Sequence, residues 1–136
     1  MATIRFFQPS EHDFVPTREL ASEASRGSEA GREGTAIRFR YPGSESEAQL
    51  FEVRCEPNLE IPVHAHAEDE IIVVVDGELH FGARVCCAGA SVYIPGHTLY
   101  GFRAGPAGAT FLNFRPRADG VYLSRDEFLA LKSNPN

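Results

Sequence analysis

Short runs of strand-forming residues, each ended by a turn rich in glycine or proline, fill most of the chain between residues 35 and 115. Runs of this kind at short spacing are typical of β-sandwiches and β-barrels. The sequence pattern predicts strands over residues 35–41, 48–55, 59–66, 71–75, 78–85, 91–94, 99–104 and 110–115. We therefore expect an all-β fold of the sandwich or barrel type.

Two predicted connections and one strand that is apolar on both faces define the expected arrangement. The pair Asp76-Gly77 predicts a two-residue hairpin turn, because such turns need positive φ angles. Residues 105–108 predict the loop between the last two strands. The run 71–75 is apolar on both faces, so both faces need a cover. One face would line the barrel and a second subunit would cover the other, so we expect a homodimer in which the first thirty residues contribute an exchanged strand.

The ends of the chain differ from the predicted barrel, residues 34–117. Residues 1–33 are irregular, turn-rich and charged, and Thr17 is a candidate N-cap for a short helix through Ser25. Ser124 and Glu127 form a capping-box pattern before an apolar run and predict a helix over residues 124–132. A chain of 136 residues fits a single domain.

Composition excludes several classes of partner. The net charge is -6 and the sequence pI is near 5.3, with no basic stripe, which argues against nucleic-acid binding. We expect no membrane association and a soluble cytoplasmic protein, because the sequence has no long apolar run and no signal pattern at its N-terminus. Cys55, Cys86 and Cys87 fit neither a disulfide framework nor zinc spacing, and we expect small, buried, reduced side chains.

His64, His66 and Glu70 are the strongest candidates for metal ligands. The two histidines share one face of a predicted strand, because alternate residues of a strand point the same way. A straight strand would carry Glu70 about 20 Å from His64. A bend within residues 67–69 is therefore required. Two imidazoles and a carboxylate suit one divalent transition metal ion, such as iron, manganese, nickel, copper or zinc.

The chain resembles the cupin superfamily in the spacing of its first motif, Asn58-x5-His64-x-His66-x3-Glu70-x6-Gly77. The segment Gly89-x5-Pro95 is similar to the opening of the second cupin motif. The resemblance implies a small single-domain cupin, with a double-stranded β-helix, or jelly-roll barrel, and here a short C-terminal helix. Asn58 stands where cupins usually carry glycine, and asparagine tolerates the left-handed backbone of a turn.

The second motif departs from the cupin pattern Pro-x-Gly-x-x-His, in which the histidine is the fourth metal ligand. Here Tyr100 stands at the histidine position and His97 at the glycine position. Tyr100 would either ligate the metal as a phenolate or donate a hydrogen bond to bound water or substrate. A third alternative has His97 enter the ligand set after the loop is re-routed. A fourth has the site lose its metal, against which the intact first motif argues.

Further candidates belong to the predicted substrate pocket. Asn113 is a polar residue in an apolar strand, and we assign it to this pocket together with His97. An arginine at the barrel mouth would bind an anionic substrate, since guanidinium matches carboxylates. The sequence does not distinguish among the arginines of the strands: Arg38, Arg40, Arg54, Arg103, Arg115 and Arg117.

The resemblance implies a metal-dependent oxidoreductase similar to quercetinase-like dioxygenases, acting on a small organic substrate in the barrel. His64 and His66 would hold the metal, and Tyr100 would either ligate it or position a bound water or substrate. Glu70 would bind the metal or detach and act as a base toward a substrate hydroxyl. The alternative is a non-catalytic small-molecule binding or sensor module. A weaker third hypothesis is a sugar-type isomerase or epimerase, which usually works without metal.

Overall fold

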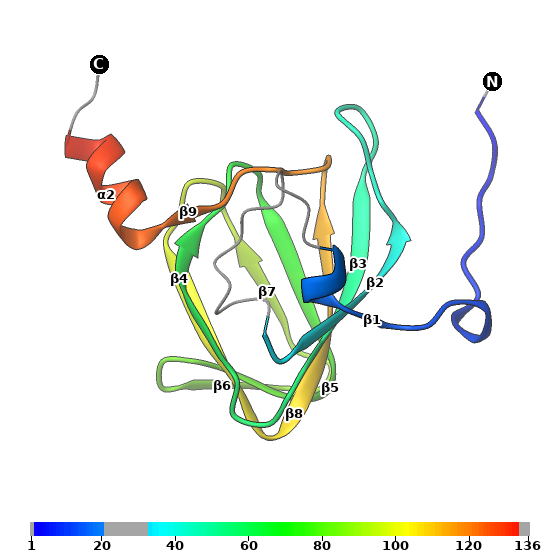
Figure 1. Ribbon diagram of the computed structural model, residues 1–136, viewed down its shortest axis with the longest axis horizontal. Coiled ribbons are helices and arrows are strands. Elements are labelled where there is room, and N and C mark those ends of the chain that lie inside the picture. The colour runs from blue at the N-terminus through cyan, green and yellow to red at the C-terminus, as the bar shows by residue number, and fades with distance from the viewer. Residues whose placement is uncertain (1, 21–32, 134–136) are drawn as a thin grey trace.

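The computed structural model describes residues 2–20 and 33–133, which form an antiparallel β-structure with a helix at the C-terminal end (Figure 1). The elements of these ranges are η1 (Pro9–Glu11), β1 (Val15–Pro16), η2 (Thr17–Leu20), β2 (Thr35–Tyr41), β3 (Gln49–Cys55), β4 (Glu60–Ala65), β5 (Glu70–Phe81), β6 (Arg84–Cys87), β7 (Ser91–Ile94), β8 (Tyr100–Arg115), β9 (Leu123–Ser124) and α2 (Arg125–Ser133). The described strands follow the order β1-β2-β3-β8-β4-β9, and β5 pairs with β6, β7 and β8. The predicted all-β fold with a short C-terminal helix is confirmed.

Strands β5 and β8 are long, and they change partners along their length. The second part of β8 pairs with β3, and its first part pairs with β4, while β5 follows it on the other side. The register between β5 and β8 shifts on either side of Asp76-Gly77. In Figure 1, β8 turns back at the lower end of the barrel, so its first and last residues both lie at the upper end. This bend brings Tyr100 and Arg115 to the same mouth.

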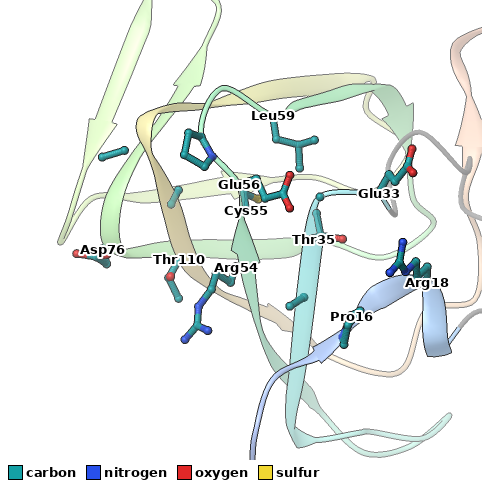
Figure 2. Close-up of a pocket in the computed structure, with 15 residues that line it drawn as sticks. Pro16, Arg18, Glu33, Thr35, Arg54, Cys55, Glu56, Leu59, Asp76 and Thr110 are labelled. Carbon is teal, nitrogen blue, oxygen red and sulfur yellow. The ribbon is translucent and has the colours of Figure 1, made fainter.

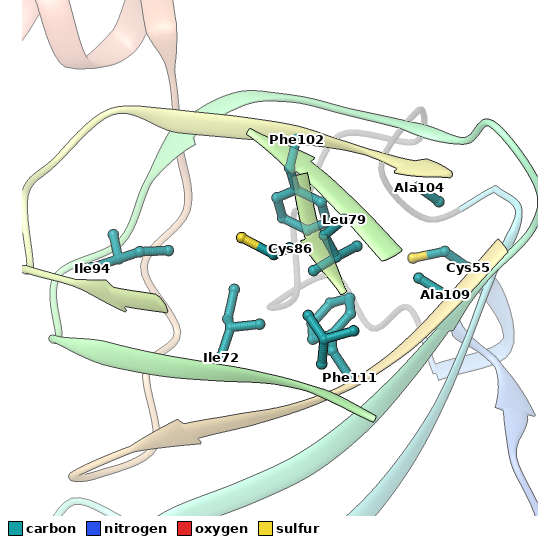
Figure 3. Packing of buried hydrophobic residues seen from close by; sticks show 10 residues of the cluster. Cys55, Ile72, Leu79, Cys86, Ile94, Phe102, Ala104, Ala109 and Phe111 are labelled. Atoms are coloured by element: carbon teal, nitrogen blue, oxygen red, sulfur yellow. The ribbon is translucent and has the colours of Figure 1, made fainter. Parts of the chain in front are cut away.

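Large apolar side chains fill the barrel interior from several strands (Figure 3). Ile72 and Val74 point inward as alternate residues of β5, and Leu79 does so after the register shifts near Gly77; all three are almost completely buried. They pack with Phe102 and Phe111 of β8, whose rings are 5.6 Å apart. Burial of each such side chain contributes roughly 1.5–3 kcal/mol. Because apolar side chains fill the interior, the polar side chains of the candidate site lie at the mouth of the barrel.

The prediction of a hairpin turn at Asp76-Gly77 is wrong. Strand β5 continues through this pair, and the chain reverses between Phe81 and Arg84 instead. Gly77 does have a positive φ, 70°, but it serves an irregularity in the pairing with β8. The loop predicted over residues 105–108 also lies within a strand, because β8 runs through it.

The turn at Asn58 and the capping box at Ser124 form as predicted. Asn58 has a φ of 61°, as expected for its place in a turn. The capping box is formed, since Glu127 N donates to Ser124 Oγ at 3.2 Å and Ser124 N donates to Glu127 Oε1 at 3.3 Å. Thr17–Leu20 is a 3-10 helix, and the rest of the helix expected there lies outside the described residues.

The three cysteines are free, and two of them are buried as expected. Cys55 and Cys86 belong to the core, and burial raises the pKa of Cys55 to about 12. Cys87 is exposed, which contradicts the expectation of a buried side chain. In the described part of the chain, no helix has the length and apolar character needed to cross a membrane.

The outer face of the sheet carries an apolar row. Leu50, Phe114, Ile71 and Tyr93 are register partners across β3, β8, β5 and β7. Phe114 and Tyr93 remain 38% and 60% exposed. The row crosses β5, which contains the run 71–75 whose two apolar faces predict a homodimer. The homodimer stays a prediction. The strand exchange expected from the first thirty residues also stays a prediction, and in the single chain β1 pairs with β2.

We expect Gly77→Ala to destabilise the barrel far more than Gly82→Ala. Both glycines have positive φ, so alanine costs each about 1–2 kcal/mol of backbone strain. A Cβ at Gly77 would also overlap the carbonyl oxygen of Gly108, whereas a Cβ at Gly82 would meet nothing within 4 Å. Urea unfolding measures both free energies of unfolding. Equal losses would show that the contact between Gly77 and Gly108 does not hold the bend.

Candidate metal and substrate site

The predicted ligands meet at the mouth formed by the end of β4, the start of β5 and both ends of β8. Tyr100 donates a hydrogen bond to Glu70 Oε1, and Arg115 Nε donates to Glu70 Oε2 at 3.0 Å. The rings of His64 and Tyr100 are 4.5 Å apart, and those of His64 and His66 are 4.9 Å apart. The bend that sequence spacing required between His66 and Glu70 is therefore present.

Two aspartates fix this bend. Asp69 Oδ1 accepts a hydrogen bond from Gly96 N at 2.7 Å, and Tyr93 donates to its Oδ2 at 2.8 Å. Asp119 Oδ2 accepts from Glu68 N at 2.8 Å. These bonds tie the turn to the loop after β7 and to the segment after β8. Neither aspartate was singled out from the sequence, because the bonds join residues far apart in the chain.

Both imidazoles are oriented by backbone carbonyls. His64 Nδ1 lies 2.7 Å from Pro62 O, and His66 Nδ1 lies 2.7 Å from Val121 O. A carbonyl only accepts, so each Nδ1 carries the proton and donates it. In the neutral ring, Nε2 then has a free lone pair, which is the arrangement that metal-ligating histidines usually show. Tyr122 stacks on His64 with its ring centroid 4.8 Å away.

Glu70 is the centre of the polar network. Glu70 is 1% exposed and Arg115 is 8% exposed, so their ion pair is almost fully removed from water. Arg115 Nη2 also lies 3.4 Å from His66 Nε2. The guanidinium packs over the ring of Phe51 at 5.3 Å. Arg115 is the arginine that the structure selects from the six that the sequence left equivalent.

Burial sets the protonation of the aromatic groups at the mouth. It lowers the pKa of His64, and together with the nearby Arg115 charge it lowers the pKa of His66 to about 4. Burial also raises the pKa of Tyr100, and the charge of Glu70 raises it further. Both histidines are thus neutral and Tyr100 is a protonated phenol at neutral pH.

The metal-free protein should lose stability as the pH falls from about 6.5 to about 4. Unfolding returns His66 to its ordinary pKa of 6.5, so in this range the unfolded chain binds more protons than the folded one. The loss is at most about 1.4 kcal/mol per pH unit for this imidazole. Urea unfolding at several pH values measures the slope, which His66→Gln should reduce and His97→Gln should not. An unchanged slope in His66→Gln would contradict the assignment.

The donor set at the mouth suits a divalent metal ion only in part. Two neutral imidazoles and a carboxylate lie within one mouth, and both imidazoles present Nε2 with Nδ1 held by a carbonyl. In the described ranges, no three His, Cys, Asp or Glu side chains are already grouped as a metal site. Both oxygens of Glu70 are bonded, one to Tyr100 and the other to Arg115. The imidazole pair fits a metal, and Glu70 has two competing partners.

The two predicted pocket residues have different positions. His97 has a φ of 57° and an exposed side chain, and it contacts the site through its backbone, since His97 N donates to His66 O at 2.7 Å. Asn113 is 4% exposed, and its Oδ1 is buried without a hydrogen-bond partner in the described part of the chain. The structure therefore brings Asn113, but not the His97 side chain, toward the polar network.

A cavity of about 860 Å³ lies at the Cys55 end of β3, beside the middle of β8 (Figure 2). Its lining includes Cys55 and Ala109, whereas the mouth described above lies at Gln49 and Arg115 on the same two strands. Of the candidate arginines, Arg54 lines this cavity, whereas His64, His66, Glu70, His97, Tyr100 and Asn113 are not among the described residues that line it.

Comparison with known proteins identifies the fold. No family model matches the chain, and no curated protein matches it either. An RmlC-like cupin from Shewanella frigidimarina NCIMB 400 superposes with a TM-score of 0.61 at 23% identity, covering 84% of this chain and 92% of that one. The polyketide cyclase RemF from Streptomyces resistomycificus gives 0.70 at 19% identity, covering 98% and 95%.

An acetylacetone dioxygenase from Acinetobacter johnsonii is also similar, with a TM-score of 0.65 at 14% identity, covering 85% of this chain and 76% of that one. At such identities the comparisons establish architecture and leave the reaction open. The chain has the fold of the RmlC-like cupins.

Proposed function

We propose that this protein is a metal-dependent cupin enzyme that acts on a small organic substrate at the mouth of the barrel, with dioxygenase-like oxidation as its reaction. One divalent transition metal ion would be held by His64, His66 and Glu70. The observation that carries the proposal is the orientation of both imidazoles by backbone carbonyls beside a buried carboxylate. When bound, such an ion supplies Lewis acidity and, if redox-active, electron transfer with dioxygen.

The protein groups around the ion would each have a defined task. Tyr100 keeps the proton on its hydroxyl and donates a hydrogen bond to Glu70, which supports a positioning role rather than a phenolate ligand. Glu70 would bind the ion or, in a base role, accept a proton from a substrate hydroxyl. Arg115 keeps the carboxylate oriented and adds a fixed positive charge. The apolar side chains below the mouth exclude water from the reacting groups.

Oxygen consumption tests the proposed dioxygenase-like oxidation. The protein is loaded with Fe²⁺ and mixed with acetylacetone, a β-diketone that the similar Acinetobacter enzyme is named for. We expect oxygen uptake above that of His66→Ala treated in the same way. Stoichiometric metal binding without oxygen uptake for acetylacetone or other β-diketones would leave the metal site in place and reject the oxidation of β-diketones.

A non-catalytic binding module is the second candidate. It is favoured by one specific observation, that both oxygens of Glu70 are already satisfied by Tyr100 and Arg115. A carboxylate bonded in this way is stable without an ion. Absence of metal binding after reconstitution with each of the five candidate ions would favour this function.

A further inference from the structure

Arg115 has hydrogen-bonding capacity that the protein does not use. A guanidinium carries five N–H donors. Two contacts are formed, from Nε to Glu70 and from Nη2 to His66, and in the described part of the chain the side chain has no other hydrogen-bond acceptor. The Arg115 side chain keeps an exposed fraction of 10%. An arginine held at a mouth with free N–H groups is suited to an anionic oxygen.

Two buried amides lie next to these free donors. Gln49 is the register partner of Arg115, and directly paired residues of antiparallel strands share a face. Asn113 lies two residues before Arg115 on β8 and points to the same side. Gln49 is 8% exposed and Asn113 is 4% exposed, and the side-chain oxygen of each is buried without a hydrogen-bond partner among residues 2–20 and 33–133. Buried acceptors without partners are rare, and each requires a donor from a ligand or water.

These groups together define a ligand. The free N–H groups of Arg115 call for a carboxylate, and the unpartnered oxygens of Asn113 and Gln49 call for a hydroxyl donor close to it. The ring of Phe51 lies under the guanidinium and fixes its plane. A divalent ion on His64 and His66 would add further positive charge to the mouth, which an anionic ligand would offset.

We propose that Arg115, Asn113 and Gln49 form a subsite for a small hydroxycarboxylate, with the carboxylate on Arg115 and the hydroxyl donating its one proton to the amide oxygen of Asn113, beside that of Gln49. The inference rests on the proposed function in one respect, because it places the substrate in the mouth that would hold the metal. It names the substrate class, and it assigns to Arg115 the selection of anions over neutral molecules of the same shape.

Lactate, methyl lactate and propionate are the probes that test this subsite. They are titrated into chelator-treated protein, and binding is followed by the side-chain resonances of Arg115, Asn113 and Gln49 in proton–nitrogen NMR spectra. Methyl lactate lacks the charge and propionate lacks the hydroxyl, so each should bind at least about tenfold more weakly than lactate. Equal binding of lactate and methyl lactate, or no binding of lactate, would overturn the proposal.

Two variants and a control assign the contacts. Arg115→Lys keeps a positive charge beside Glu70 but lacks the planar fork, so we expect it to lose about tenfold in lactate affinity. Asn113→Leu should fold at least as stably as the wild type and bind lactate no better than propionate. Arg117→Lys, at a 56% exposed side chain paired with Glu68, should behave as the wild type. Wild-type lactate affinity in Arg115→Lys would overturn the role of Arg115.

Metal content is measured separately on the same preparations, so the two proposals can fail separately. Selective lactate binding by a protein that takes up no metal would reject the proposed function and support the subsite. Stoichiometric metal binding without selectivity for lactate would reject the subsite alone.

Discussion

Alanine at His64 or at His66 is expected to weaken the binding of a divalent transition metal by at least about a hundredfold. Each substitution removes one of two imidazoles whose Nδ1 is held by a carbonyl, which leaves the lone pair on Nε2. In His66 an ion would take the place of the 3.4 Å contact between Nε2 and Arg115 Nη2. One remaining imidazole and a carboxylate bonded to Arg115 would not retain the ion through dialysis. Mass-spectrometric metal analysis and calorimetric titration with Zn²⁺ measure the loss.

Two further variants separate the alternatives at the second motif. His97→Ala should retain full metal content, because the His97 side chain is exposed and contacts the site only through the backbone. Tyr100→Phe should also retain it, because the Tyr100 hydroxyl donates to Glu70. Metal loss in His97→Ala would support the re-routed loop. Loss in Tyr100→Phe, together with a phenolate band in the Fe³⁺ protein, would support Tyr100 as a ligand.

The strand runs and the ligand parity could be predicted because they depend on neighbouring residues. Alternation along residues 35–41 and the capping box at Ser124 are local patterns, and both elements form. The spacing of His64 and His66 likewise implied one face, and the need to include Glu70 implied a bend. The structure places all three side chains in one mouth.

The Asp76-Gly77 error has a non-local cause. A local pattern can show that Gly77 adopts positive φ, which is correct. It cannot show whether the chain reverses there, because continuation of β5 depends on pairing with Thr110 and Ala109, more than thirty residues later. The true reversal uses Gly82, whose φ is 61°.

The choice among the six strand arginines also depends on distant residues. Arg38 and Arg40 bond to Glu52, at 2.8 and 2.5 Å. Burial alone would raise the pKa of Glu52, but these two arginines outweigh it and hold that pKa below its ordinary value. Arg115 has the same local context of an apolar strand, yet it pairs with Glu70 because β8 ends beside the start of β5.

Removing the charge of Arg115 is expected to cost about 3–5 kcal/mol of the free energy of unfolding in the metal-free protein. Arg115→Gln leaves Glu70, only 1% exposed, without its counter-charge. The double variant Glu70→Gln with Arg115→Gln should be more stable than Arg115→Gln alone, because it contains no buried charge. Urea unfolding of both single variants, the double variant and the wild type gives the coupling energy. Additive losses would show that the pair does not act as a unit.

The same variants show whether Glu70 is a metal ligand. A ligand that binds only the folded state stabilises it by mass action. If Zn²⁺ binds to Glu70, it supplies the positive charge that Arg115→Gln has lost, so Zn²⁺ should raise the melting temperature of Arg115→Gln more than that of the wild type. In the wild type, the ion must share the Glu70 carboxylate with Arg115. Equal shifts in both proteins would mean that the imidazoles bind the ion without Glu70, and the carboxylate would then belong to the arginine alone.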